Sequence, residues 1–175
     1  MQESLFLTTS AARRLYETAK TLPIADYHCH LSPKELFENR PFKSLASLWL
    51  SGDHYKWRLM RACGIDESRI TGPQSFDERC KAYLSCVTQS PGNPLYTWTA
   101  MELSFLIGKP VTLTKENAMA LYHEADEALK QRCPTPRSLV LAANVKALAT
   151  TDDPTDSLCY HEALRADRRF VPTGL

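Results

Sequence analysis

The sequence lacks a long apolar segment, a dense basic run and a secretion signal. No stretch approaches the roughly 20 apolar residues that cross a bilayer, and the N-terminal residues MQESLFLTTSAARR lack the basic start and apolar middle of a secretory signal. The 21 Lys and Arg residues and 20 Asp and Glu residues are interspersed, so the net charge is only +1 and no phosphate-binding surface is indicated. We therefore expect a cytoplasmic protein that binds neither membranes nor nucleic acids.

The sequence also lacks the usual motif of a thiolate metal site. Its six cysteines include no Cys-x-x-Cys pair, and the closest two, Cys80 and Cys86, are not spaced like a zinc knuckle. Because nothing indicates secretion, disulfides are not expected. We predict reduced thiols that are buried as small hydrophobic side chains. The cysteines are Cys29, Cys63, Cys80, Cys86, Cys133 and Cys159.

Internal repeats and low-complexity segments are absent as well, and the composition is that of one globular domain. The chain has 175 residues, of which 43% are apolar and 23% charged. A first helix is predicted over 11–20, with Thr9 or Ser10 as its cap and with Ala11, Leu15 and Ala19 on one face. A short buried strand of a parallel sheet is predicted over 24–31, between Pro23 and Ser32-Pro33.

The rest of the chain is predicted to be helical up to a second strand. Residues 34–137 contain repeated Pro and Gly breaks, and their clearest helix is predicted over 115–131, capped by Thr114. A second strand is predicted over 145–150, then a helix to about 165 capped by Asp153, then the start of a third strand at 169–173. This order is typical of the opening βαβ portion of a parallel α/β fold.

The segment Asp26-Tyr27-His28-Cys29-His30 is the most specific local feature. On a strand, His28 and His30 point to the same face with Cα atoms about 6 to 7 Å apart, close enough to bind one ion. Active sites of parallel folds gather at the carboxyl ends of strands, which favours a metal pair over an ordinary His-x-His sequence. A catalytic zinc normally has three protein ligands. Candidates for the third are His54, Asp152 and Asp153, and their spacing selects none of them.

A second cluster of chemically active side chains lies at Gly52-Asp53-His54-Tyr55-Lys56-Trp57-Arg58. His54 and Tyr55 can donate to sugar hydroxyls beside a cation for a carboxylate. Alternatively, the segment is an ordinary helix start with Asp53 as cap, Trp57 in the core and Arg58 and Arg61 in solvent. The segment Thr151-Asp152-Asp153 has two similar interpretations, catalysis or helix capping by an aspartate. His123 and His161 are predicted to be surface or packing residues in helices.

Four segments, taken in order, resemble the N-terminal part of the uronate isomerases (glucuronate isomerases), a metal-dependent family of the amidohydrolase superfamily. They are ARRLYETAKTLPIADYHCHLSPKEL at 12–36, FKSLASLWLSGDHYKWRLMRACGI at 42–65, GNPLYTWTAMEL at 92–103 and VKALATTDDPTDSLCYH at 145–161. The resemblance implies an α/β fold, the N-terminal part of a (β/α)8 barrel with a large helical insertion after strand 1. Within one incomplete barrel domain, 1–175, we expect the first helix and strand 1 in 1–33, the insertion in 34–137, and strand 2, its helix and the start of strand 3 in 138–175.

The resemblance also implies an activity and a set of site residues. Family members interconvert D-glucuronate with D-fructuronate and D-galacturonate with D-tagaturonate. By resemblance, His28 and His30 are ligands of a divalent metal, zinc or alternatively manganese, while His54 and Tyr55 contact the sugar acid and Tyr55 transfers a proton. The expected partner is a small uronate, and the chain is a candidate homo-oligomer.

The resemblance covers only the beginning of a longer protein, so we expect a truncated form. Open sheet edges would follow, because a barrel is stabilised by closure and by its packed interior. Two alternatives remain open at this stage: an inactive truncated remnant and a metal-dependent hydrolase of the same superfamily.

Overall fold

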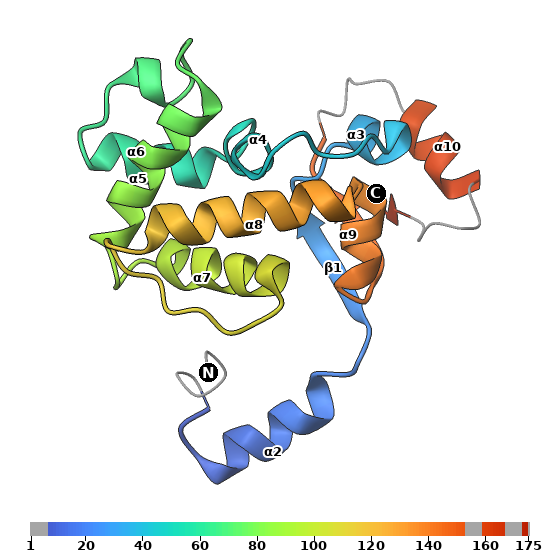
Figure 1. Cartoon of the computed structure of the whole chain (residues 1–175). Coiled ribbons are helices and arrows are strands. Elements are labelled where there is room, and N and C mark those ends of the chain that lie inside the picture. The colour runs from blue at the N-terminus through green and yellow to red at the C-terminus, as the bar shows by residue number, and fades with distance from the viewer. Residues whose placement is uncertain (1–6, 153–158, 167–172, 175) are drawn as a thin grey trace. The chain divides into compact units, whose positions relative to one another are not determined.

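The computed structural model describes residues 7–152, 159–166 and 173–174, which form two compact units (Figure 1). One unit comprises 42–133, and the other comprises 7–41 together with the described residues from 134 onward. None of the helices in these ranges is long and apolar enough to cross a membrane. In chain order the elements are α2 (Ser10–Ala19), β1 (Ile24–Cys29), α3 (Pro33–Glu38), α4 (Leu45–Leu50), α5 (His54–Ala62), the 3-10 helix η1 (Glu67–Arg69), α6 (Phe76–Thr88), α7 (Pro94–Ile107), α8 (Ala118–Arg132), α9 (Pro136–Ala142), β2 (Val145–Thr150), α10 (Cys159–Ala166) and β3 (Thr173–Gly174).

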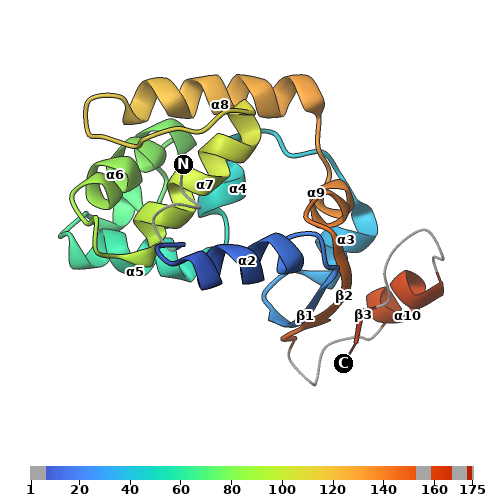
Figure 2. The same cartoon turned by 90° about the horizontal axis from the view of Figure 1, so that it is seen from below.

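A parallel sheet of order β1-β2-β3 forms the centre of the second unit (Figure 2). Ile24 pairs with Val145 at one end of β1 and Cys29 pairs with Thr150 at the other. The predicted parallel α/β class and second strand are confirmed. Strand β1 ends at Cys29, two residues earlier than predicted, because Ser32 caps the following helix α3 by accepting from the Glu35 N–H. The predicted cap Asp153 lies outside the described residues.

The core of this unit is small. Among the residues that the structure describes, it consists of Cys29, Leu36, Val140, Leu148 and Leu164. Thr9 caps α2 as predicted, by accepting from the Ala12 N–H, but the apolar stripe of that helix is not covered, because no residue of α2 is buried.

Helices α3 and α9 are held together by one arginine and one asparagine in the same unit. Asn39 ends α3 in the left-handed conformation, with φ 50°, and its side-chain oxygen accepts from the Arg137 N–H at 3.1 Å. The Arg137 guanidinium donates to the Leu36 carbonyl at 2.7 Å. The last carbonyls of α3, which its short helix leaves without internal partners, are therefore satisfied by a cation.

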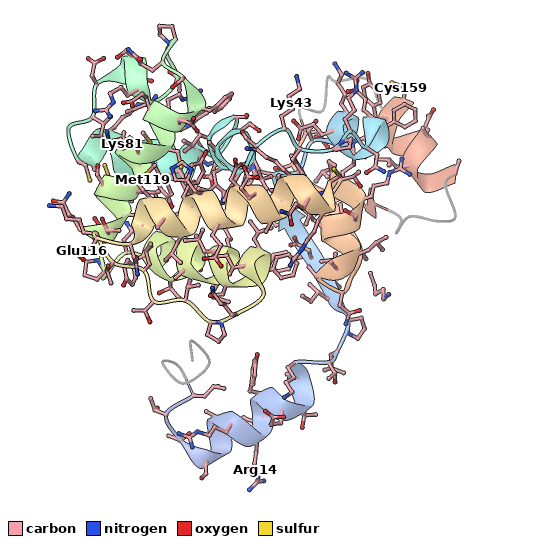
Figure 3. All side chains as sticks on the ribbon, in the orientation of Figure 1. Arg14, Lys43, Lys81, Glu116, Met119 and Cys159 are labelled. Carbon is pink, nitrogen blue, oxygen red and sulfur yellow. The ribbon has the colours of Figure 1, made fainter. Side chains whose placement is uncertain are left out.

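The first unit, 42–133, is helical and contains the larger core (Figure 1). Tyr83 and Tyr122 are almost fully buried in it, and the Trp49 ring lies edge-on to Tyr83 with centroids 5.9 Å apart. The Tyr83 hydroxyl forms a hydrogen bond of 2.6 Å with that of Thr99, so this buried polar group is satisfied. Met119, on α8, packs against the core (Figure 3).

Helix α8 confirms the predicted apolar face but begins later than predicted. Tyr122, Ala125 and Leu129 are buried, as their helical spacing indicates. The helix starts at Ala118, because Thr114 and Asn117 form a turn in which each side chain accepts from the other residue's N–H. Thr114 therefore stabilises the turn before the helix and is not its cap.

Asp126 connects α8 to the start of α4 within the first unit. Its buried carboxylate accepts from the Leu45 N–H at 2.6 Å and pairs with Lys130 at 2.8 Å. The Leu45 N–H is one of the donors that every helix start leaves without an internal partner. A side chain 81 positions away in sequence supplies the acceptor.

The burial of the cysteines follows the prediction only in part. The described residues contain no disulfide among the six cysteines, and Cys29, Cys80 and Cys86 are buried. Cys63, Cys133 and Cys159 are exposed, so the prediction is wrong for these three. Cys63 and Cys133 end helices α5 and α8, and Cys159 begins α10 (Figure 3).

We predict that Asp126→Ala lowers the free energy of unfolding of the helical unit by about 1–3 kcal/mol, because the Leu45 N–H loses its acceptor in a buried environment. Urea unfolding followed by tryptophan fluorescence reports on this unit alone, since Trp49, Trp57 and Trp98 all belong to it. Glu127→Ala is the control, because its exposed ion pair with Lys130 contributes little. Equal stabilities of the two variants would contradict this prediction.

The lowered pKa of Glu67 predicts how the stability of the helical unit depends on pH. Hydrogen bonds from Arg61, at the end of α5, and from Thr71 lower the pKa of Glu67 from 4.5 to about 2. Because the folded-state pKa lies below the ordinary one, the interaction stabilises the unit above about pH 4.5 and is lost as the pH falls toward about 2. Carboxyl NMR titration should give this midpoint, and Arg61→Ala should raise it; an ordinary pKa in the unsubstituted protein would refute the account.

Candidate functional site

His28 and His30 lie together at the carboxyl end of β1. His28 belongs to the strand and His30 follows it directly, and their ring centroids are 5.0 Å apart with the rings nearly perpendicular, at 86°. Both side chains are exposed, whereas Cys29 between them is buried. The strand alternation predicted from the sequence therefore separates the imidazole pair from the core.

The pair fits part of a metal-ligand set. Imidazole nitrogens are common ligands of zinc and manganese, and two rings at this separation can converge on one ion. Across the described part of the chain, no three or more His, Cys, Asp and Glu side chains are grouped to hold a metal. Of the predicted third ligands, Asp152 forms hydrogen bonds with other protein groups. Asp153 lies outside the described residues, and His54 belongs to the helical unit.

Asp152 and its neighbours form a hydrogen-bond network at the end of β2. The carboxylate Oδ2 accepts from the Thr150 hydroxyl at 2.6 Å and lies 2.9 Å from Nε2 of His161. His161 is 2% exposed, so the prediction that it packs in a helix is confirmed. For Asp152 the contacts support a structural role that neither sequence interpretation included.

Thr151, between Thr150 and Asp152, contacts the end of β1. Its hydroxyl donates to the Cys29 carbonyl at 3.0 Å and lies 3.1 Å from Nδ1 of His30. The Thr151 N–H donates to the same carbonyl at 3.1 Å. The sequence singles out the segment that contains Thr151 but not this contact, because nothing in a threonine after a strand indicates which side chain lies opposite it.

The Cys29 thiol lies between the two imidazoles in sequence and is buried, whereas both histidines are exposed. Burial raises the pKa of its thiol, the hydrogen bond from the Leu31 backbone opposes the rise, and the negative charges of Asp26 and Asp152 add smaller increases. Because the thiol is buried while both imidazoles are exposed, the imidazoles are the donors presented at this strand end.

His54 and Tyr55 occupy the first turn of α5 in the helical unit. Asp53 caps this helix by accepting from the N–H groups of Tyr55 at 2.9 Å and of Lys56 at 3.1 Å. Its other oxygen binds the Lys56 ammonium at 2.6 Å. Burial alone would raise the pKa of Asp53, but these hydrogen bonds and the Lys56 charge lower it overall. The predicted cap is therefore confirmed.

The side chains at this helix start form one exposed polar and aromatic group. The rings of His54 and Tyr55 stack with centroids 4.5 Å apart and an interplanar angle of 29°. The Arg58 guanidinium lies 5.6 Å from the centroid of the Tyr55 ring, which is 49% exposed. An imidazole, a phenol and a cation on one surface can donate to hydroxyls and attract a carboxylate.

Lys56 stabilises this turn from its buried side by pairing with Asp53, although it was not predicted as a site residue. It is 6% exposed, which is rare for lysine and requires a compensating charge. Asp53 supplies one, and Glu102 lies close enough for its charge to interact with Lys56. Burial raises the pKa of Glu102, against the opposing effect of Lys56. The spacing Asp53-x-x-Lys56 was the available signal, since residues three apart share a helix face.

The structure thus groups the four predicted site residues into two pairs. His28 and His30 belong to the sheet-containing unit, and His54 and Tyr55 belong to the helical unit. Each pair is preorganised by contacts within its own unit.

Comparison with known proteins gives a consistent result. The family model described as glucuronate isomerase matches residues 1–173. Uronate isomerase of Streptococcus agalactiae serotype III (strain NEM316) is 48% identical over 168 residues, which cover 96% of this chain and 36% of that protein. Uronate isomerase of Clostridium acetobutylicum is 45% identical over 171 residues, which cover 97% of this chain and 36% of that protein. The chain thus spans a little over a third of the length of the relatives that it matches.

Solved structures agree with these relatives. The crystal structure of uronate isomerase from Thermotoga maritima superposes with a TM-score of 0.87 at 34% sequence identity, covering 98% of this chain and 38% of that one. Glucuronate isomerase from Caulobacter crescentus gives a TM-score of 0.82 at 28% identity, covering 96% of this chain and 36% of that one. Since the family model matches nearly the whole sequence, this chain belongs to the glucuronate isomerase family.

Proposed function

We propose that this protein is a uronate isomerase that converts D-glucuronate to D-fructuronate and D-galacturonate to D-tagaturonate. The observation that carries the proposal is the imidazole pair of His28 and His30, with ring centroids 5.0 Å apart, at the carboxyl end of the first parallel strand in a chain of this family. The names of the relatives support isomerisation over the hydrolase alternative.

The proposal includes the finer description of the fold. Strands β1, β2 and β3 would be the first strands of a (β/α)8 barrel of the amidohydrolase superfamily, and 34–137 would be a helical insertion within the single domain 1–175. The parallel order β1-β2-β3 supports this assignment, because barrel strands follow one another in sequence order.

The chemistry requires a proton to move between C1 and C2 of the open-chain sugar, through an enediolate. Such a site needs an acid/base group and a positive charge near the developing oxyanion. A divalent ion, zinc or alternatively manganese, would supply electrostatic stabilisation of that charge. His28 and His30 would hold the ion through ring nitrogens.

The residues at the start of α5 would bind the substrate. Tyr55 is the proposed proton-transfer group, because its half-exposed phenol both donates and accepts. His54 would donate to sugar hydroxyls and Arg58 would attract the carboxylate. The cap at Asp53 and the buried Lys56 limit the movement of this turn, which favours a fixed geometry for the substrate.

The partners and location remain as the sequence predicts. We propose a small uronate as the ligand of a cytoplasmic protein that forms homo-oligomers and does not bind nucleic acids or membranes. The near-neutral net charge of +1 supports the last part.

Zinc binding tests the proposed ligands. The double variant His28→Ala/His30→Ala should lose at least 10-fold in Zn²⁺ affinity, measured by calorimetry on the purified protein, because both nitrogen donors are removed. His123→Ala is the control, since His123 is exposed on α8 in the helical unit. If the double variant and the control bound zinc equally well, His28 and His30 would not be the ligands.

Isomerase turnover tests the activity. Purified protein with Zn²⁺ or Mn²⁺ should form ketouronate from D-glucuronate or D-galacturonate, and Tyr55→Phe should lower kcat by about 10²–10⁴-fold, because general acid/base groups contribute that much. Tyr27→Phe should keep the rate, because the Tyr27 side chain is 91% exposed and neighbouring residues of a strand point to opposite faces, so that Tyr27 does not share the face of His28. A folded, zinc-loaded protein without turnover would overturn the proposed activity.

A further inference from the structure

Thr151 is placed to control the chemistry of His30. Strands β1 and β2 are in register at their ends, where Cys29 pairs with Thr150. Thr151 follows at once and is attached to the Cys29 carbonyl by two hydrogen bonds, from its N–H at 3.1 Å and from its hydroxyl at 3.0 Å. With the side chain fixed at both points, its Oγ1 lies 3.1 Å from Nδ1 of His30.

The donors in this arrangement follow from the chemistry of the groups. A carbonyl oxygen only accepts, so the single hydrogen of the Thr151 hydroxyl points to Cys29. At the contact with His30, the hydroxyl oxygen must therefore accept and Nδ1–H must donate. A neutral imidazole carries one proton, so the lone pair in this state is on Nε2.

We propose that Thr151 is a positioning residue that holds His30 in the Nδ1–H tautomer, so that Nε2 is the ring nitrogen that would bind a divalent transition-metal ion. This inference rests on the proposed function of His30 as a ligand. A metal-binding histidine commonly donates its second ring N–H to a protein group, which fixes both tautomer and ring orientation. Thr151 provides that acceptor from the neighbouring strand.

The residues on either side of Thr151 support this role, because they are held in place. The Thr150 hydroxyl and Nε2 of His161 both contact the Asp152 carboxylate, at 2.6 and 2.9 Å. His161 is buried and Asp152 is largely shielded, with a side chain 22% exposed. The segment that carries Thr151 is therefore tied to α10 as well as to β1, which restricts rotation of the hydroxyl away from His30.

Two variants separate the hydroxyl from the shape of the side chain. Thr151→Val keeps a β-branched side chain of nearly the same volume but cannot accept from Nδ1–H. Thr151→Ser keeps the hydroxyl. A thermal unfolding scan of both variants checks that the fold is retained. If valine impairs folding, the tautomer of His30 in the unsubstituted protein still tests the proposal.

The first readout needs no metal. Long-range ¹H–¹⁵N NMR of the imidazoles, at about pH 8.5 and so above the ordinary histidine range, distinguishes protonated from unprotonated ring nitrogens. His30 should show a protonated Nδ1 and an unprotonated Nε2 in the unsubstituted protein and in Thr151→Ser. In Thr151→Val, part or all of the His30 signal should change to the Nε2–H form. An Nε2–H tautomer in the unsubstituted protein, or an unchanged Nδ1–H tautomer in Thr151→Val, would overturn the proposal.

The second readout is Zn²⁺ affinity measured by calorimetry, with His30→Ala as reference. Thr151→Val should weaken affinity by about 10–100-fold, as loss of such an acceptor does, and Thr151→Ser should stay within about threefold of the unsubstituted protein, a difference under 1 kcal/mol. If His30→Ala leaves the affinity unchanged, the proposed metal function fails, while the tautomer measurement still decides the hydrogen bond. If His30→Ala abolishes binding but Thr151→Val does not weaken it, the positioning role alone is overturned.

Discussion

The parallel pairing of β1 with β2 is the constraint on which the imidazole pair depends. Parallel strands end at the same edge of a sheet, so the residues that follow β1 and β2 are neighbours although about 120 positions separate them in sequence, as in the contact between Thr151 and His30. The Cys29 carbonyl accepts two hydrogen bonds there, which fixes the backbone between the two histidines. The proposed tautomer of His30 follows from this strand pairing, because the pairing brings Thr151 to the His30 ring.

In the helical unit, the start of α5 depends on a different constraint, which is the buried charge of Lys56 behind the exposed rings of His54 and Tyr55. Lys56 and Asp53 form a pair whose members are both shielded, and Asp53 simultaneously caps the helix. Removing Asp53 would leave the charge of the buried Lys56 to be balanced by the neighbouring Glu102, and removing Lys56 would leave Asp53 without its ion pair. His54 and Tyr55 are thus carried on a turn that is rigid from within, while their rings remain available to a ligand.

Much of the fold could be predicted because local patterns determine it. The cap at Asp53 and the buried face of α8 follow from capping chemistry and helical periodicity. The errors arose where tertiary structure decides: the stripe of α2 is uncovered although its spacing is amphipathic, and three cysteines at helix ends are exposed. The turn formed by Thr114 and Asn117 delays α8 because each side chain bonds the other residue's backbone.

For the candidate site, the residue types were predictable and their supporting contacts were not. Alternation on a strand places His28 and His30 on one face from sequence alone. The role of Thr151 depends on the register between β1 and β2, and the pairing of His161 with Asp152 depends on how α10 packs. Neither the register nor the packing can be predicted from the local sequence pattern. Lys56 shows the same difficulty, because a lysine is expected in solvent unless its buried partner is known.

X-ray absorption at the zinc edge of the zinc-loaded protein tests the central claim most directly, because it reports the atoms around the ion. The account predicts at least two imidazole nitrogens at about 2.0–2.1 Å, with the imidazole scattering lost in His28→Ala/His30→Ala. Bound zinc whose spectrum shows no imidazole, or a spectrum that the double substitution does not change, would contradict the assignment of His28 and His30 as a metal-binding pair.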